Sequence, residues 1–258
     1  MIIIADNLHV INPVIAQAVE TLDSQPISAM VQRCAQAGAH AIDINCGPLK
    51  RSPERRMAFL VETVQSVADL PVMLDTTNPA AMAAGLKAAR HRPIINGFSL
   101  EPIKLEHILP LAQTHASDIV GYLLDAHSRV PITEDEMMAV AVTLFETYCR
   151  AGLDPARLII DPVITPLTWD NGLRHNQAVL SLIRHLPDLL GTHVRTMAGL
   201  SNLASGPMPL PRKIALEQAF LPMLAAAGLD MVLTNVLHEP TMETARNCGI
   251  LLSEQVFA

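Results

Sequence analysis

Aromatic side chains are scarce in this sequence: phenylalanine, tryptophan and tyrosine together make up 3% of its 258 residues. Half of the residues are nonetheless hydrophobic, so a core built from this chain must be aliphatic. No stretch reaches the roughly 18 consecutive apolar residues that a membrane-spanning helix needs. The apolar start at residues 1–4 is too short for a signal peptide. We therefore expect a cytoplasmic protein with a large aliphatic core.

Basic clusters and closely spaced metal ligands are also missing. The formal net charge is −7, and the absence of a basic run argues against a nucleic-acid or anionic-membrane partner. The four cysteines form no Cys-x-x-Cys pair, so zinc and thioredoxin-like sites lack support. The histidines show no ligand spacing either, and we expect no metal site. Histidines expected to be solvated on helices or loops are His91, His107, His115, His175, His185, His193 and His238.

Eight apolar runs suited to buried strands are distributed along the chain. They occupy residues 2–5, 40–46, 70–74, 92–99, 119–124, 158–160, 194–200 and 230–235. Each is followed by enough residues for a helix. Several helix starts carry capping signals, such as Asn12-Pro13, Asn78-Pro79 and the Thr133-x-x-Glu136 capping box. Alternating strands and helices with continuously apolar strands indicate a parallel sheet.

Eight such units in a chain of this length are typical of a closed barrel, which needs roughly 250 residues. We therefore predict an α/β fold, a single (β/α)8 TIM barrel that forms one domain over residues 1–258. The alternative is an open, doubly wound sheet, but no Gly-x-Gly-x-x-Gly turn supports it. In a barrel, the chemistry is found at the carboxyl ends of the strands.

Polar residues stand at or near the carboxyl ends of the predicted strands. They are Asp43, Asn45, Asp75, Asn96, Asp125, Asp161, Ser201, Asn202 and Asn235. Each has an ordinary explanation when taken alone, because Asp and Asn also form turns and helix caps where strands end. Asp75 has the alternative of capping a turn over Thr76 and Thr77, and Asn78 is assigned to capping alone.

Asp43 and Asn96 are harder to explain as turn residues, because they lie inside strands with apolar neighbours on both sides. A buried carboxylate needs hydrogen-bond donors or costs several kcal/mol. Few Lys or Arg residues lie near the rim positions in the sequence. A ligand that presents several N–H donors would meet the need, so the pattern predicts a site for an aminopyrimidinone such as a pterin or guanine.

A family resemblance rests on five short segments. They are Asp43-Ile44-Asn45, Leu74-Asp75-Thr76-Thr77-Asn78, Ile95-Asn96, Ile160-Asp161-Pro162 and Gly199-Leu200-Ser201-Asn202. Together they resemble the pterin-binding barrel family, and within it the methyltetrahydrofolate:corrinoid methyltransferases. The likeness covers essentially the whole chain. Dihydropteroate synthases, another branch of the family, would carry Ser-Arg-Lys where this chain has Ser201-Asn202-Leu203.

The resemblance implies transfer of a methyl group between N5 of 5-methyltetrahydrofolate and the cobalt of a corrinoid held by a partner protein. It implies that Asp75, Asn96 and Asp161 hydrogen-bond the pterin and that Asn202 lies beside N5. Catalysis would then rest on Asn202, Asp75 and Asp161. Further residues assigned to the substrate site are Asp43, Asn45, Ser201, Asn7 and Arg212, the last with the alternative of a solvated helix-start residue. A homodimer is also expected from the resemblance.

The first strand departs from the family pattern. Members usually have Glu-Arg-Ile-Asn where this chain has Asp6-Asn7-Leu8-His9, and we carry over only Asn7. The Asp125-x-His127 pair is similar to part of a corrinoid-binding motif, but Val130 stands at its glycine position, so we expect the corrinoid on the partner. Two alternatives to the methyltransferase remain: a dihydropteroate synthase-like enzyme and a non-catalytic folate-binding subunit.

Overall fold

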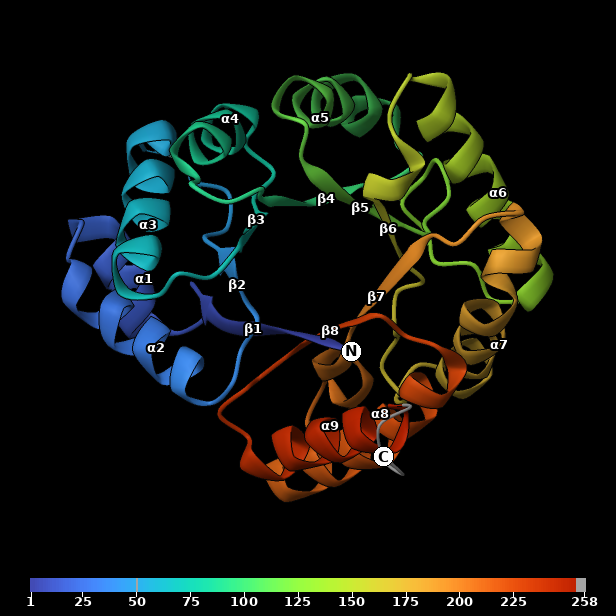
Figure 1. Cartoon of the computed structure of the whole chain (residues 1–258). Helices are drawn as coiled ribbons and strands as arrows, with labels where there is room; N and C mark the ends of the chain where they lie inside the picture. Colours follow the sequence, from blue (N-terminus) through green and yellow to red (C-terminus); the bar gives the residue numbers. More distant parts are fainter. Residues whose placement is uncertain (50, 254–258) are drawn as a thin grey trace.

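A computed structural model of the protein describes residues 1–49 and 51–253 (Figure 1). Eight strands form a closed barrel in chain order. They are β1 Ile2–His9, β2 Ala41–Asn45, β3 Val72–Asp75, β4 Ile94–Phe98, β5 Asp118–Tyr122, β6 Leu158–Asp161, β7 Arg195–Gly199 and β8 Met231–Thr234. Neighbouring strands are parallel, and β8 closes the ring by pairing with β1. The predicted (β/α)8 barrel is therefore confirmed.

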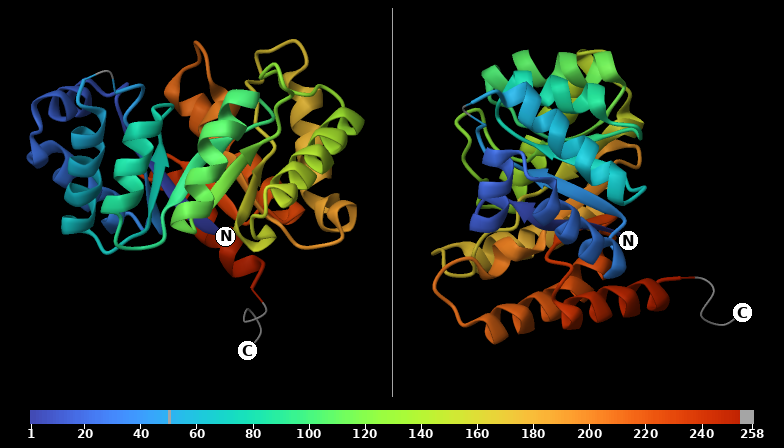
Figure 2. Two further views of the ribbon diagram at one scale, coloured as in Figure 1. Left: turned by 90° about the horizontal axis from the view of Figure 1, so that it is seen from above. Right: turned by 90° about the vertical axis from the view of Figure 1, so that its left-hand side faces the viewer.

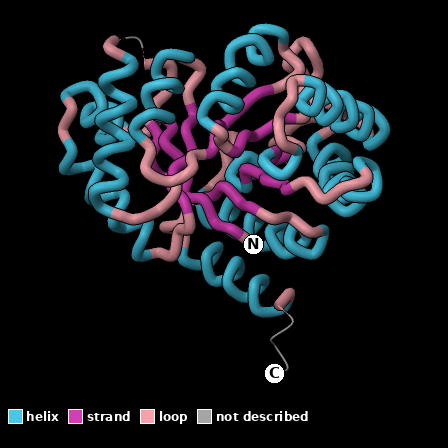
Figure 3. Tube along the Cα trace, turned by 45° about the horizontal axis from the view of Figure 1, so that its top comes forward, coloured by secondary structure: helices cyan, strands magenta, loops and turns pink. Residues whose placement is uncertain are grey.

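Helices surround the ring of strands and link each strand to the next (Figures 1 and 3). They are α1 Pro13–Thr21, α2 Ser24–Gln36, α3 Pro53–Val67, α4 Pro79–Ala88, α5 Pro102–His115, α6 Glu134–Arg150, α7 Gly172–Leu190, α8 Leu210–Ala227 and α9 Glu239–Leu251, with short 3-10 turns η1 Pro155–Arg157 and η2 Leu200–Ala204. Figure 2 shows the same layer of helices from two other directions. Within the described residues, every helix is too short or too polar to span a bilayer.

The capping signals read from the sequence are present at the helix starts. Asn12 accepts a hydrogen bond from the backbone nitrogen of Val14, and Asn78 accepts from those of Ala80 and Ala81. At the start of α6, the Thr133 hydroxyl accepts from the Glu136 backbone, and the Glu136 carboxylate accepts from the Thr133 backbone. These caps satisfy backbone donors that the helices cannot satisfy themselves.

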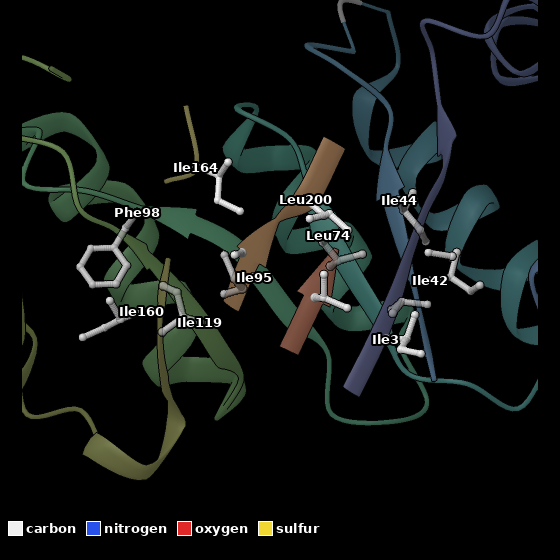
Figure 4. Close-up of a cluster of buried hydrophobic side chains, with 14 of the residues drawn as sticks. Ile3, Ile42, Ile44, Leu74, Ile95, Phe98, Ile119, Ile160, Ile164 and Leu200 are labelled. Atoms are coloured by element: carbon white, nitrogen blue, oxygen red, sulfur yellow. The ribbon is translucent and has the colours of Figure 1, made fainter. Parts of the chain in front are cut away.

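The aliphatic core has two parts, separated by the strands. The larger part lies between the outer faces of the strands and the helices, and includes Ile42, Leu74, Ile95 and Ile160 (Figure 4). The smaller part fills the barrel with one side chain from each strand, and we call it the barrel floor. It consists of Ile4, Ala41, Met73, Ile94, Val120, Ile159, Met197 and Met231. The barrel is therefore a packed core and not a pore, as is general for this fold.

A layer of mostly polar residues follows the barrel floor towards the carboxyl ends of the strands. Side chains alternate between the two faces of a strand, so the residue two positions after each floor residue shares its face. These residues are Asp6, Asp43, Asp75, Asn96, Tyr122, Asp161, Gly199 and Leu233, and we call them the polar layer. Tyr122 and Leu233 pack directly on the floor. The fold thus places four carboxyl groups above an apolar base.

The first strand is longer than predicted. We expected it to end at Ala5, but β1 continues to His9, with a shift of register against β2 between Ala5 and Leu8. Continued pairing with β2 holds the polar segment in the barrel, because Leu8 and His9 pair with Ile44 and Asn45. The prediction that the first strand ends at Ala5 is therefore wrong.

The capping box of α6 allows a test of local stability. Replacing Thr133→Ala removes one cap hydrogen bond and is expected to lower the free energy of unfolding by about 1 kcal/mol, measured by denaturant titration. The matched control is Thr143→Ala, because Thr143 is exposed within α6 and its hydroxyl only bonds back to the Ala139 carbonyl. Equal effects of the two substitutions would contradict the capping role.

Candidate functional site

Two carboxylates of the polar layer lie on adjacent strands with little access to water. Asp43 on β2 is 2% exposed, and its Oδ1 has no hydrogen-bond partner among the described residues. Burial, and then the charges of Asp75 and Asp6, raise the pKa of Asp43 well above its usual value. Asp75 on β3 accepts a hydrogen bond of 2.6 Å from the Asn45 side-chain amide. The predicted side chains Asp43, Asn45 and Asp75 are thus brought together.

Burial raises the pKa of Asp75 to about 6, against the opposing effects of Lys104 and Asn45. The Asp75 side chain faces a cavity of about 480 Å³ and accepts a hydrogen bond from Asn45. The alternative that Asp75 only caps a turn over Thr76 and Thr77 therefore finds no support in its hydrogen bonding.

Asn96 on β4 is oriented by Tyr122 on β5. The Tyr122 hydroxyl donates a hydrogen bond to the side-chain oxygen of Asn96, which leaves the amide nitrogen as a donor. That amide favours the ionised form of Asp43 and so opposes the rise in its pKa. The ammonium of Lys104 on α5 lies 6.0 Å from the centre of the Tyr122 ring. Sequence reasoning missed both Tyr122 and Lys104.

Asp161 ends β6 and belongs to the same group. Burial raises the pKa of Asp161 to about 7, although its carboxylate accepts a hydrogen bond of 2.7 Å from the Val163 backbone. Burial, followed by the charges of Asp75, Asp161 and Asp43, raises the pKa of Tyr122. Three carboxylates on different strands thus lie close enough to Tyr122 to oppose its ionisation.

The loop after Asp161 is held by α7. Val163 adopts a positive φ of 63°, a strained conformation for a β-branched residue. The two ring nitrogens of His175 each lie 2.7 Å from a carbonyl oxygen, one of Pro131 and one of Val163. The Asn176 side chain bonds both the nitrogen and the carbonyl of Thr165. The prediction that His175 is solvated is wrong, because its ring is buried and clamps two loops together.

The cavity beside Asp75 opens over β3, β4 and β5. Its lining includes Asp75, Asn96, Lys104, His107 and Tyr122. A volume of about 480 Å³ lies in the range of roughly 300–1,000 Å³ usual for small-molecule sites. Asp161 is not part of this lining and is connected to it through Tyr122.

A larger cavity of about 670 Å³ lies between the loops that follow β5 and β6. Arg129, Thr165, Trp169 and His175 are among the residues that line it. The His175 clamp therefore borders this cavity on one side and supports the loop of Asp161 on the other.

Ser201 and Asn202 follow β7 in the turn η2, and both are exposed. The Ser201 hydroxyl donates a hydrogen bond of 3.1 Å to the carboxylate of Asp6. The amide nitrogen of Asn202 lies only 3.1 Å from where a Cβ on Gly199 would be, so glycine leaves room for Asn202 to fold over the end of β7. Within the described residues, no hydrogen bond joins Asn202 to Asp75, Asn96 or Asp161.

Asn7 and Arg212 are placed differently from the carboxylates. The Asn7 amide donates to the side-chain oxygen of Asn235 at 2.6 Å, and its own oxygen accepts from the Val236 backbone. Asn7 thus holds the loop after β8. Arg212 lies exposed in the first turn of α8. Asp125, a rim candidate, accepts two backbone hydrogen bonds from its own loop, so for Asp125 the turn explanation is correct.

The chain matches the sequence profile of the family described as "Pterin binding enzyme" over residues 14–235. The chain belongs to this family. The sequence resemblance to the pterin-binding barrel family is therefore confirmed.

Two relatives are similar in sequence. The Methylcorrinoid:tetrahydrofolate methyltransferase of Eubacterium limosum is 26% identical over 234 residues, covering 89% of this chain and 83% of the relative. The methionine synthase of Mycobacterium tuberculosis is 24% identical over 209 residues, covering 77% of this chain but only 17% of the synthase. The chain therefore corresponds to a small part of that larger enzyme.

Solved structures of dihydropteroate synthases share the fold. The enzyme from Stenotrophomonas maltophilia with active site-bound imidazole aligns with a TM-score of 0.71 at 16% identity, covering 98% of this chain and 93% of that one. The enzyme from Xanthomonas albilineans in complex with 7,8-dihydropteroate gives 0.67 at 20% identity, covering 98% and 94%. At these identities the likeness concerns the fold.

The raised pKa of Asp161 predicts a pH-dependent stability. Asp161 titrates near 3.8 in the unfolded chain and near 7 in the folded protein, so the folded state binds more protons between these values. Stability contributed by this group is therefore lost as the pH rises from 3.8 to 7. Between these pH values, denaturant titrations should show that the free energy of unfolding of Asp161→Asn declines less than that of the wild type, by on the order of 1–4 kcal/mol. Asp188→Asn, on the exposed face of α7, serves as the control, and an unchanged decline in Asp161→Asn would contradict the assignment.

Proposed function

We propose that this protein is a methyltransferase that moves a methyl group between N5 of tetrahydrofolate and the cobalt of a corrinoid carried by a partner protein. The family membership supports pterin binding, and the similarity to a methylcorrinoid:tetrahydrofolate methyltransferase supports the reaction type. The observation that carries the proposal is the set of carboxylates on the barrel strands β2, β3 and β6 above the apolar floor, with Asp43 and Asp161 buried and Asp75 lining the cavity.

These carboxylates fit the donor edge of a pterin. The edge presents the ring N–H and the exocyclic amine, and ionised carboxylates are hydrogen-bond acceptors only. Burial raises the pKa values of Asp75 and Asp161 to about 6 and about 7, because it removes water that would otherwise donate hydrogen bonds to each carboxylate. N–H donors from a ligand would supply them, and charge-assisted hydrogen bonds of this kind are the stronger ones. We therefore assign Asp75, Asn96 and Asp161 to pterin binding, with Asp43 and Asn45 as their supports.

Asn202 is assigned to the reacting nitrogen. When the methyl group leaves, the electron pair of the broken bond remains on N5, and N5 is a poor leaving group unless it gains a proton or a hydrogen bond. The exposed amide of Asn202 above Gly199 is free to donate such a bond, and a bond that strengthens in the transition state accelerates the reaction. The corrinoid of the partner accepts or delivers the methyl group at the open mouth.

Binding is the first test of the proposal. Asp161→Ala is expected to weaken the affinity for 5-methyltetrahydrofolate roughly 10- to 100-fold, because a hydrogen bond to a charged group contributes about 1.5–3 kcal/mol. Isothermal titration calorimetry measures the dissociation constant directly. Asp188→Ala on α7 is the matched control and should bind as the wild type does. Undiminished affinity of Asp161→Ala would defeat the assignment of Asp161.

Catalysis is tested at Asn202. Asn202→Ala should slow methyl transfer roughly 100-fold while changing the affinity for 5-methyltetrahydrofolate only a few fold, since the amide acts mainly in the transition state. Single-turnover transfer to cob(I)alamin, followed by its absorbance, gives the rate. A loss confined to affinity would remove Asn202 from the chemistry. Formation of dihydropteroate from p-aminobenzoate and a pterin pyrophosphate would instead establish the synthase alternative.

A further inference from the structure

A second group of polar side chains, partly or fully buried, lies near β1, β8 and α8. Glu217 on α8 is 5% exposed, and its Oε2 lies 3.8 Å from Nδ1 of His238 in the loop after β8. That separation exceeds a hydrogen bond. Neither of these atoms has a hydrogen-bond partner among the described residues, and the same is true of Nδ1 of His9 on β1. Unsatisfied buried groups of this kind require an explanation.

Two asparagines determine which ring nitrogen of His238 carries the proton. The side-chain oxygen of Asn235 accepts from the Asn7 amide at 2.6 Å and from the Leu237 backbone at 3.0 Å. The amide nitrogen of Asn235 is therefore the group that lies 3.2 Å from Nε2 of His238. An amide nitrogen only donates, so Nε2 accepts and the ring proton is on Nδ1, facing Glu217. The ring nitrogen that faces Glu217 is therefore a donor, and Nε2 is occupied by the Asn235 amide.

The charge environment favours a proton on Glu217. Burial raises the pKa of Glu217, with His238 opposing and the nearby Asp6 adding to the rise. Burial likewise raises the pKa of Asp6, which the Ser201 hydrogen bond, His9 and His238 partly offset. Asp6 and Glu217 thus influence each other, and His238 lies near both.

Asp6 is the member of the group that reaches the mouth of the barrel, and its charge acts on Glu217. The Asp6 carboxylate belongs to the polar layer and accepts the hydrogen bond of Ser201, the neighbour of Asn202. The remaining titratable groups that act on the cluster are Asp43 on β2, Cys34 on α2 and Lys213 on α8. We refer to Asp6, His9, Glu217 and His238 as the Glu217 cluster.

We propose that the Glu217 cluster stores the proton exchanged with N5 of the folate, an inference that rests on the proposed function. When the methyl group passes to the Co(I) corrinoid, the N5–carbon bond breaks and its electron pair remains on N5. The cobalt supplies the electron pair of the new bond to carbon. N5 then takes one proton from the cluster, and the cluster regains that proton from water. In the reverse direction the proton returns to the cluster.

In this scheme Glu217 and His238 touch neither the pterin nor the methyl group. They hold the proton that Asp6 passes to the mouth, and are therefore positioning residues. Their side chains would set how readily a proton is available, while Asp75, Asn96 and Asp161 bind the pterin. Substitutions in the Glu217 cluster and substitutions of the pterin-binding residues should therefore have different measurable effects. Substitutions in the cluster change proton exchange, whereas substitutions among the carboxylates change affinity.

The test counts the protons exchanged when 5-methyltetrahydrofolate binds, by calorimetry in buffers of different ionisation enthalpy. When the ligand binds, the lone pair of N5 should favour the protonated cluster, so the wild type takes up a proton from solvent. The ionisation of Asp75 and Asp161 on binding releases protons, and this release is common to all variants. Glu217→Gln and His238→Gln should lose the uptake. The control is Glu243→Gln on the exposed face of α9.

In the same variants, transfer to cob(I)alamin at pH 7 should slow roughly tenfold with the dissociation constant changed less than about twofold. Circular dichroism and thermal melting verify the fold, and His238→Gln provides the test if Glu217→Gln does not fold. Equal proton numbers in all four proteins would overturn the proposal and leave the methyltransferase function standing. Failure of the wild type to bind 5-methyltetrahydrofolate would refute the proposed function itself.

Discussion

The interior of this barrel is shaped by like charges that share a water-poor space. The closed sheet places a floor of aliphatic side chains below and the carboxyl groups of Asp6, Asp43, Asp75 and Asp161 directly above it. Each charge makes its neighbours costlier to ionise, and burial adds to that cost. In the free protein, Asn45, Asn96 and Lys104 offset only part of the cost of ionising these carboxylates. Such local instability is common where a site is built for a ligand and not for maximal stability.

The surrounding elements hold these groups in place without neutralising them. Asn45 fixes Asp75, Tyr122 fixes Asn96, and the Val163 backbone fixes Asp161 while His175 fixes Val163. Most of these supports come from adjacent strands or from α7, so the positions of the acceptors depend on rigid elements. Preorganisation of this type lowers the cost of binding, because few side chains need to be ordered when the ligand arrives.

The sequence predicted the strands and helix starts well, because apolar runs and caps such as Asn78 and Thr133 are local signals. It also identified the buried Asp43 and Asn96, whose polarity contrasts with their neighbours. It missed Tyr122, since an aromatic residue at a strand end is indistinguishable from core. It placed Asp6 outside the barrel, because continued pairing of β1 with β2 is a tertiary effect. The burial of His175 depends on carbonyl groups 44 and 12 residues away, which no local pattern reveals.

The hydrogen bond from Tyr122 to Asn96 has a consequence for molecular discrimination. Because the Asn96 oxygen is occupied, the amide presents only its nitrogen, while the neighbouring carboxylates present only oxygens. A ring that carries a carbonyl in place of the exocyclic amine, as in a lumazine, would set oxygen lone pairs against carboxylate lone pairs and leave buried acceptors unpaired. Mismatches of this kind cost far more than a missing methylene in an apolar pocket. If the pterin binds as proposed, the carboxylates of Asp75 and Asp161 therefore discriminate against deaminated analogues without any steric barrier, while the Asn96 nitrogen pairs with a ring acceptor.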